Sequence, residues 1–149
     1  YDSGRKCPPW ADYVGLSDEL DQLIGEADIV VNALPLTDAT AGLFDRALFE
    51  KMRRSAHFIN VGRGGTVVTD DLVAALESGH IAGAGLDVAD PEPLPVDHPL
   101  WQMTNVIITP HISSTGADRA YHLILLREDV PRYLAGDALL NVVDPERGY

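Results

Sequence analysis

Residues 56–88, AHFINVGRGGTVVTDDLVAALESGHIAGAGLDV, decide the fold class of this 149-residue chain. Two short apolar runs, 56–61 and 82–88, flank an amphipathic segment that ends at Gly79. Apolar runs of this length are typical of strands buried in a parallel sheet, and a strand, a helix and a second strand form its repeating unit. The stretch therefore predicts an α/β fold, with a parallel sheet flanked by helices.

The same alternation continues on both sides of this stretch. Two further strands are expected, at 27–34, which we take to be buried, and at 105–109. The proline-rich segment 90–99 is expected to be irregular. The expected helices are one that Ser17 caps, one over 47–52 that Asp45 caps, one that Thr69 caps before Gly79, and one between His111 and Gly136.

The last of these helices is apolar around much of its circumference. A helix that is hydrophobic on several sides is normally buried on several sides. We therefore expect it to be covered by other parts of the protein. The residues concerned are Tyr121, Leu123, Ile124, Leu125, Leu126 and Val130.

Composition excludes several classes of function. The chain has 23 acidic and 11 basic residues, a formal net charge of -12, which disfavours binding to nucleic acid or to an anionic membrane surface. Its single cysteine, Cys7, cannot form an intrachain disulfide, and no apolar stretch approaches the roughly 18 residues of a membrane span. We therefore expect a globular protein of the reducing cytoplasm.

The ends of the four expected strands point to one binding site. In open α/β sheets, ligands bind beyond the carboxyl ends of the strands. Each expected strand is followed by polar or glycine-rich residues, which together predict a single pocket. These residues are Leu34-Pro35-Leu36-Thr37, Gly62-Arg63-Gly64-Gly65, Asp87 to Glu92, and Pro110-His111.

Three of these residues together indicate acid–base chemistry on an anionic substrate. Taken singly, Arg63 and Glu92 are more simply explained as solvated loop residues, and His111 is explained equally well by packing or capping. A carboxylate bonded to an imidazole favours the protonated ring, however, and an arginine can hold a carboxylate by two parallel hydrogen bonds. Such a site can deliver a proton to a carbonyl oxygen.

Other chemistries have less support. The chain has no GxSxG or HExxH motif, and its five histidines show no metal-ligand spacing with Cys7 or with each other, so we expect no metal. Ser113 and Ser114 could suggest a nucleophile, but hydroxyls beside a helix start are more often caps. The dinucleotide-binding motif GxGxxG is absent, because Gly62-Arg63-Gly64-Gly65 lacks its spacing.

Three motifs give the chain a specific resemblance. Asn60-Val61-Gly62-Arg63-Gly64, Gly85-Leu86-Asp87-Val88 with Glu92-Pro93-Leu94-Pro95, and Thr109-Pro110-His111-Ile112-Ser113 resemble the D-isomer-specific 2-hydroxyacid dehydrogenases. Their order matches, and so do the separations of 29 positions from Arg63 to Glu92 and 19 from Glu92 to His111. Within the family the chain is most similar to the glyoxylate/hydroxypyruvate reductase-like members. Glutamate at 92 argues against the formate dehydrogenase branch, which has glutamine there.

The resemblance implies a division of the chain into two parts. Residues 1–112 would be the second part of a Rossmann-like NAD(P)-binding domain, whose GxGxxG turn lies upstream of this chain. Residues 113–149 would be a linking helix and the last segment of a flavodoxin-like substrate domain. The missing motif is then explained by an absent N-terminal half, and we expect the 149-residue chain alone to bind dinucleotide weakly at best. The resemblance also implies a homodimer.

The resemblance also assigns a role to each site residue. His111 would protonate the carbonyl of a small 2-oxoacid as hydride arrives from NAD(P)H, Glu92 would orient His111, and Arg63 would hold the substrate carboxylate. Asp87 would accept a hydrogen bond from the nicotinamide carboxamide. The cofactor would also lie along Leu34, Pro35, Leu36, Thr40, Val61, Gly62, Arg63, His111, Ser113 and Ser114.

The first residues of the chain bear on cofactor choice. An acid at the end of the second strand of a nucleotide-binding domain binds the adenosine ribose and favours NAD, and Asp2 fits that description. A basic cluster at the same place accommodates the 2′-phosphate of NADP. Ser3, Arg5 and Lys6 fit the second description, so the sequence slightly favours NADP over NAD.

The alternative function is a non-catalytic regulatory protein of the same fold that binds a dinucleotide, as corepressors of this superfamily do.

Overall fold

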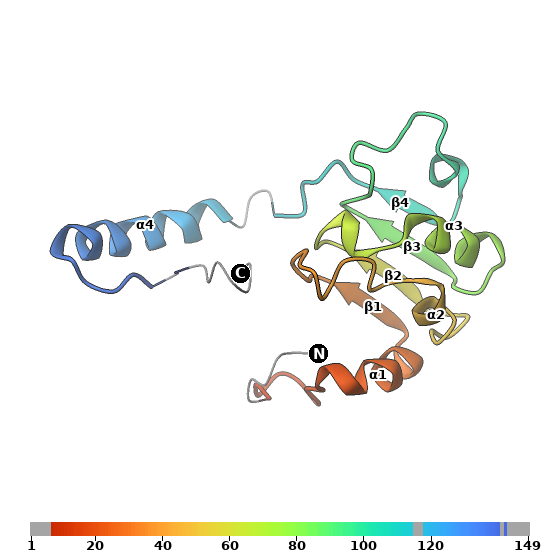
Figure 1. Ribbon diagram of the computed structural model, residues 1–149, viewed down its shortest axis with the longest axis horizontal. Helices are drawn as coiled ribbons and strands as arrows, with labels where there is room; N and C mark the ends of the chain where they lie inside the picture. The colour runs from red at the N-terminus through yellow and green to blue at the C-terminus, as the bar shows by residue number, and fades with distance from the viewer. Residues whose placement is uncertain (1–6, 115–117, 141, 143–149) are drawn as a thin grey trace.

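The computed structural model describes residues 7–114, 118–140 and 142. A four-stranded parallel sheet forms its centre, with the strands side by side in chain order (Figure 1). This confirms the predicted α/β class, and each strand lies inside a predicted apolar run. The strands are β1 (Ile29–Asn32), β2 (His57–Asn60), β3 (Gly83–Leu86) and β4 (Val106–Ile108).

The helices occur at the expected places along the chain, but two of the predicted caps are wrong. Asp45 does cap its helix, because its carboxylate accepts from the Leu48 amide at 2.9 Å. Ser17 does not cap a helix, because the 3-10 turn at this place has Leu16 as its N-cap. The Glu19 carboxylate accepts a hydrogen bond from the Leu16 amide at 2.8 Å. Thr69 lies inside its helix and donates its hydroxyl to the carbonyl of Asp90 instead. The helices are α1 (Leu20–Glu26), α2 (Arg46–Phe49), α3 (Thr69–Glu77) and α4 (Asp118–Ala135), with 3-10 turns η1 (Ser17–Glu19), η2 (Gly64–Thr66) and η3 (Pro99–Gln102).

One hydrophobic core lies between one face of the sheet and the first three helices. Phe58 of β2 is at its centre, with the ring of Phe44 at 4.9 Å and that of Phe49 edge-on at 5.3 Å. Such aromatic pairs add roughly 0.5–1.5 kcal/mol each beyond the burial of their surface. Ile24 of α1 and Leu76 of α3 belong to the same buried cluster. The sheet is therefore fixed from one side, and its strand ends have a rigid support.

The opposite face of the sheet is open, which corrects the prediction of a buried first strand. Along β1, Val30 is buried, whereas Ile29 and Val31 are 63% and 60% exposed. Ile107 of β4 is exposed as well. Side chains alternate between the two faces of a strand, and the described helices contribute only to the core on the other face. The apolar run indicated a strand correctly but not how many of its faces are covered.

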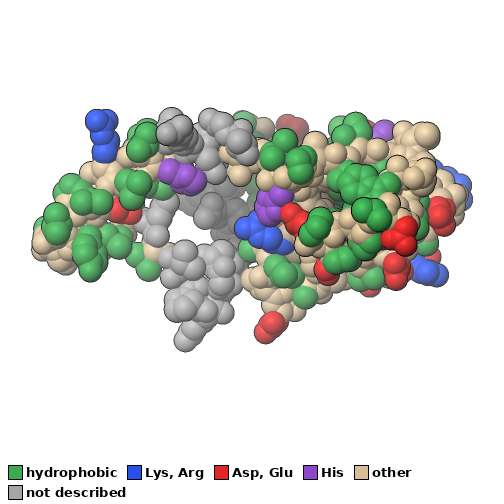
Figure 2. All heavy atoms as spheres, turned by 90° about the horizontal axis from the view of Figure 1, so that it is seen from above, with side chains coloured by type: hydrophobic (Ala, Val, Ile, Leu, Met, Phe, Trp, Pro, Cys, Tyr) green, Lys and Arg blue, Asp and Glu red, His purple; other side chains and the backbone are tan. Residues whose placement is uncertain are grey.

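Helix α4 leaves the sheet and extends away from it (Figure 1). Its apolar side chains form an exposed surface (Figure 2), so the prediction that it is buried on several sides is wrong for this chain. Leu123, Ile124, Leu126 and Val130 are all more than half exposed, because no described element packs over them. The helix ends before Gly136, as predicted, where φ is 75°. Tyr121 was part of the same prediction, but its side chain lies outside those that are described. Within the described ranges, no helix combines the length and the apolar character needed to cross a membrane.

Candidate active site

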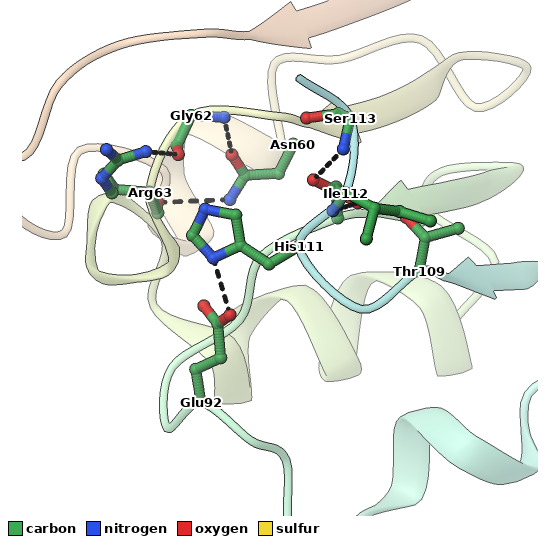
Figure 3. Close-up of polar contacts among 9 residues, drawn as sticks. Asn60, Gly62, Arg63, Glu92, Thr109, His111, Ile112 and Ser113 are labelled. Atoms are coloured by element: carbon green, nitrogen blue, oxygen red, sulfur yellow. Dashed lines mark hydrogen bonds and ion pairs between the residues drawn. The ribbon is translucent and has the colours of Figure 1, made fainter. Parts of the chain in front are cut away.

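The four strands end together at one edge of the sheet. Their last residues, Asn32, Asn60, Leu86 and Ile108, are lateral partners from β1 to β4. Because the strands are parallel, every segment that follows a strand leaves from this edge, as the sequence predicted. Figure 3 shows Arg63 from the end of β2 and His111 from the end of β4 at this edge.

His111 and Glu92 form a pair at this edge. The Nδ1 of His111 lies 2.8 Å from Oε1 of Glu92, and the two side chains are 46% and 41% exposed. A carboxylate can only accept, so Nδ1 donates, and Nε2 is directed away from Glu92 (Figure 3). An imidazole held this way can give a proton from Nε2 to a bound molecule and be stabilised by the carboxylate while it carries the charge.

The carboxylate of Asp87 holds the turn that carries His111. Its Oδ1 accepts from the Thr109 hydroxyl at 2.6 Å and the Ile112 amide at 2.9 Å, and its Oδ2 accepts from the Ser113 amide at 2.8 Å. The carbonyl of Asp87 accepts from the His111 amide at 2.9 Å. These bonds fix a turn in which His111 has φ 53°, a left-handed conformation that residues other than glycine adopt rarely.

The same hydrogen bonds keep Asp87 ionised. Burial alone raises the pKa of this carboxyl, which is 5% exposed, but the bonds from the Thr109 hydroxyl and from the amides of Ile112 and Ser113 outweigh burial and hold the pKa well below its ordinary value. A carboxylate has about four acceptor positions, and groups of this chain use at least three of them, with the Ser113 hydroxyl close enough to lower the pKa as well. The predicted hydrogen bond from a cofactor carboxamide would have to share the carboxylate with these groups, and it stays a prediction.

Asp87→Asn is expected to lower the melting temperature at pH 7 by several degrees, because an amide NH2 in place of Oδ2 meets the Ser113 amide donor to donor. The pKa of Asp87 is lowered in the folded protein, so its stabilisation is complete above the unfolded value of about 3.9 and is lost as the pH falls through the lower folded value. The difference in melting temperature from the unchanged protein should therefore shrink between pH 7 and pH 3, as measured by circular dichroism. A difference that is the same at both pH values would contradict this, and Asp97→Asn, at an exposed carboxyl, is the control.

Arg63 lies in a turn that packs between two other loops. A Cβ on Gly62 would lie 2.6 Å from the carbonyl oxygen of Leu34, and one on Gly64 would lie 1.8 Å from that of Ala89. Both positions therefore require glycine. The Arg63 side chain is exposed and donates from Nη1 to the Gly62 carbonyl at 2.8 Å. Since a guanidinium has five N–H donors in a fork, it can still offer two of them to a carboxylate.

The loop after β1 carries the other residues predicted along the cofactor. The hydroxyl of Thr40 donates to the Pro35 carbonyl at 2.6 Å and accepts from the Thr37 amide at 2.8 Å, so Thr40 shapes this loop from within. Apolar side chains from this loop and from the end of β2 are available at the site edge. Leu34, Pro35 and Val61 are half-buried, and Leu36 is exposed.

The remaining predicted residues differ in how they are placed. Ser113 and Ser114 are exposed beside His111, and the Ser113 amide is already bonded to Asp87. Asp2, Ser3 and Arg5 lie outside the described residues.

A hollow of about 490 Å³ lies beside the His111–Glu92 pair. Glu92, Asp87 and Thr109 form its polar part, and Leu94 and Trp101 are among its apolar lining.

Among the residues that the structure describes, no group of three His, Cys, Asp or Glu side chains could hold a metal ion.

Sequence reasoning missed a buried polar cluster beneath this edge. Asn32, Asn60 and Thr66 are each at most 1% exposed and are hydrogen-bonded to one another. A signal was present, since an asparagine interrupts each of the two apolar runs, 27–34 and 56–61, near its end. Amides at the end of a buried strand need partners, which predicts that the two are paired.

The comparisons with known proteins agree with this geometry. Residues 4–113 match the family described as "D-isomer specific 2-hydroxyacid dehydrogenase, NAD binding domain". The chain therefore belongs to the D-isomer specific 2-hydroxyacid dehydrogenase family. It is 47% identical over 128 residues to glyoxylate/hydroxypyruvate reductase B of Enterobacter sp. (strain 638), an alignment that covers 85% of this chain and 40% of that protein. The chain thus spans less than half the length of this relative.

Solved structures of the family have the same fold. A D-isomer specific 2-hydroxyacid dehydrogenase from Xanthobacter autotrophicus Py2, in complex with NADPH and MES, superimposes with a TM-score of 0.83 at 46% identity, over 89% of this chain and 55% of that one. An NADPH-dependent glyoxylate/hydroxypyruvate reductase from Sinorhizobium meliloti, in complex with NADP and sulfate, gives 0.81 at 39% identity, over 89% and 43%. The parallel sheet and its helices are therefore those of the Rossmann-like NAD-binding domain of this family.

Proposed function

We propose that this chain is the part of an NAD(P)H-dependent 2-oxoacid reductase that holds the acid and the substrate carboxylate, with glyoxylate or hydroxypyruvate as the substrate class. The observation that carries the proposal is the 2.8 Å contact between His111 Nδ1 and Glu92 Oε1, at the same sheet edge as Arg63. The family of the chain and its glyoxylate/hydroxypyruvate reductase relative support it.

The residues present fit one end of a nicotinamide dinucleotide. Half-buried apolar side chains at Leu34, Pro35 and Val61 suit a flat ring, and a cation and an imidazole suit a carboxylate and a carbonyl beside it. The other end needs a phosphate-binding turn, and the sequence has no GxGxxG. When bound, the reduced cofactor supplies the hydride that reduces the substrate carbon.

The side chains of this chain account for the rest of the reaction. Arg63 binds the substrate carboxylate through two N–H groups, which orients the adjacent carbonyl toward His111. As the carbonyl oxygen gains negative charge, His111 donates the proton from Nε2 and becomes neutral. Glu92, bonded at Nδ1, stabilises the protonated ring before the transfer and fixes its orientation. In the reverse direction the neutral imidazole accepts the proton from a 2-hydroxyacid.

The proposed reaction needs more chain than the 149 residues. We propose that residues 1–112 complete an NAD(P)-binding domain with an N-terminal half that carries the phosphate-binding turn, and that 113–149 belong to a second, flavodoxin-like domain. The whole protein would act in the cytoplasm as a homodimer. The length of a relative supports a longer protein with further domain parts, because the chain covers only 40% of the Enterobacter reductase.

The assay that tests the function follows the absorbance of NADPH with glyoxylate and with hydroxypyruvate in the full-length protein. We expect oxidation of NADPH with at least one of them, and no oxidation without a 2-oxoacid. Tight binding of NADPH without turnover of any 2-oxoacid would overturn the proposal and favour a regulatory dinucleotide-binding protein.

Cofactor preference is the subject of a separate prediction. Arg5→Ala in the full-length protein is expected to lower the preference for NADPH over NADH by about tenfold, because a contact between a cation and the 2′-phosphate worth about 1.4 kcal/mol corresponds to that factor. The two solved relatives with NADPH or NADP bound support a choice of NADP. The measurement is the ratio of kcat/KM for the two cofactors. Arg54→Ala, at an exposed arginine, is the matched control and should leave the ratio unchanged. An unchanged ratio in Arg5→Ala would show that residues other than Arg5 set the cofactor preference.

A further inference from the structure

We propose that the buried cluster of Asn32, Asn60 and Thr66 is the positioning device of the site, because it holds the loop after β1 and the Arg63 turn in one fixed arrangement. None of the three side chains is accessible to a substrate at the sheet edge, since each residue is at most 1% exposed. They are positioning residues, and the inference rests on the proposed function of Arg63.

The cluster begins as a cross-strand pair. Asn32 and Asn60 are the last residues of β1 and β2 and are direct partners in register. The Nδ2 group of Asn32 donates to Oδ1 of Asn60 at 3.0 Å and to Oγ1 of Thr66 at 2.7 Å. Both N–H bonds of this amide are therefore used, and Thr66 of η2 is joined to β1 directly and to β2 through Asn32. No buried side-chain nitrogen or oxygen in the described part of the chain lacks a partner.

The remaining groups of the cluster bind the backbone of the two loops. Oδ1 of Asn32 accepts from the Leu34 amide at 3.1 Å, and Oδ1 of Asn60 accepts from the Gly62 amide at 3.1 Å. Each asparagine thus fixes the backbone two residues after its own strand end. The Leu34 carbonyl and Gly62 are packed so closely that no Cβ fits between them.

The carbonyl of Arg63 is the point where the cluster meets the substrate anchor. It accepts from the Thr66 hydroxyl at 2.6 Å, from Nδ2 of Asn60 at 3.3 Å, and from the Thr66 amide at 3.2 Å. A peptide group with this many donors cannot rotate without breaking bonds inside the protein. The direction in which the Arg63 side chain leaves the backbone is therefore set from below, by groups that a substrate never touches.

This arrangement explains why polar side chains are retained in the core. Burying three polar residues is costly unless every donor and acceptor is paired, and a fully paired network makes one geometry much more stable than others. Two loops leaving adjacent strands would otherwise move independently. With the cluster intact, a change in the loop that would line the cofactor is transmitted to the turn that would hold the substrate carboxylate.

The test compares two substitutions at Thr66 in the full-length protein. Thr66→Val keeps the shape of the side chain but removes the hydroxyl, and Thr66→Ser keeps the hydroxyl. We expect Thr66→Val to raise KM for the 2-oxoacid and the inhibition constant of oxamate, a non-reacting analogue, by about fivefold to tenfold, because the bonds of the hydroxyl to Asn32 and to the Arg63 carbonyl are both lost. Thr66→Ser should stay within about twofold of the unchanged protein. Asn60→Asp, which turns a carboxylate oxygen toward the Arg63 carbonyl, should give the same shift as Thr66→Val.

Two further measurements separate positioning from stability and from the proposed function. Leu76→Val removes a methylene from the core on α3, should lower the melting temperature, and should leave both constants unchanged. Hydrogen exchange at the Leu34 and Gly62 amides needs no substrate and should be faster in Thr66→Val at both amides. Unchanged exchange there, or equal effects of Thr66→Val and Leu76→Val on the oxamate constant, would overturn the inference. If the unchanged protein reduces no 2-oxoacid, the proposed function fails, and faster exchange at both amides would still support the coupling.

Discussion

His111→Gln is expected to lower kcat for reduction of hydroxypyruvate or glyoxylate by about 10³-fold, within the range that general acid catalysis normally contributes. Glutamine can still hydrogen-bond to Glu92 through its amide, but it has no proton to give at neutral pH. NADPH binding in the full-length protein should change far less than kcat, because glutamine keeps a hydrogen-bonding group at this position and the other residues predicted along the cofactor are unchanged. Steady-state kinetics and NADPH fluorescence titration measure the two effects separately.

His57→Gln is the matched control, since His57 is an exposed histidine at the opposite end of β2 and should be replaced without loss. Glu92→Gln should have an intermediate effect, because the imidazole keeps a hydrogen-bond partner but loses the charge that stabilises its protonated form. Turnover in His111→Gln equal to that of the unchanged protein would exclude His111 as the acid and would leave the proposal without its central residue.

Arg63→Ala is expected to lower kcat/KM for the 2-oxoacid by about 10²- to 10³-fold, because two charge-assisted hydrogen bonds to the substrate carboxylate are lost together. The substitution leaves the backbone contacts of residue 63 in place, since the Arg63 carbonyl and not its side chain is bound by Thr66. Most of the loss should appear in KM. The inhibition constant of oxamate should rise in parallel, as measured by competition.

Arg63→Lys distinguishes the charge from the geometry. A lysine keeps the positive charge but cannot make two parallel hydrogen bonds, so we expect it to recover only a small part of the lost activity. Arg53→Ala is the control, because Arg53 pairs with Asp28 on the surface at 3.0 Å. An Arg63→Ala protein with unchanged KM would show that the carboxylate is bound elsewhere.

Local sequence rules predicted the order and type of the elements because each is encoded within a few residues. The apolar runs gave all four strands, and the helix at 69–77 followed from its amphipathic period and Gly79. Strand lengths were overestimated, since apolar residues continue past the last paired residue. The Thr69 cap was wrong for a different reason. Its hydroxyl is used by the carbonyl of Asp90, 21 positions away, and no local rule anticipates that partner.

The candidate site residues could be selected from the sequence, whereas the buried residues that support them could not. Arg63, Glu92 and His111 carry side chains whose chemistry is specific, so their positions at strand ends already suggested a site. The side chains of Asn32 and Thr66 do not indicate one kind of site, because an amide or a hydroxyl can form hydrogen bonds in a turn, a cap or a buried network. Only the register of β1 and β2 shows that they meet.

The environment of α4 could not be predicted from its own residues. Its apolar composition indicates that something covers it, as it would in any helix hydrophobic on several sides. A helix sequence does not say whether that cover comes from the same sheet, and here the described sheet provides none.

The left-handed backbone at His111 means that the residue best for stability at this position differs from the residue that the proposed chemistry needs. A residue with a Cβ loses about 1–2 kcal/mol in this conformation, which glycine adopts freely. A library of variants screened for thermal resistance alone would therefore enrich glycine or asparagine at 111 and discard the residue that we propose as the proton donor. Directed evolution of this chain should hold position 111 constant and seek added stability in the core around Phe58, far from the residue whose conformation limits it.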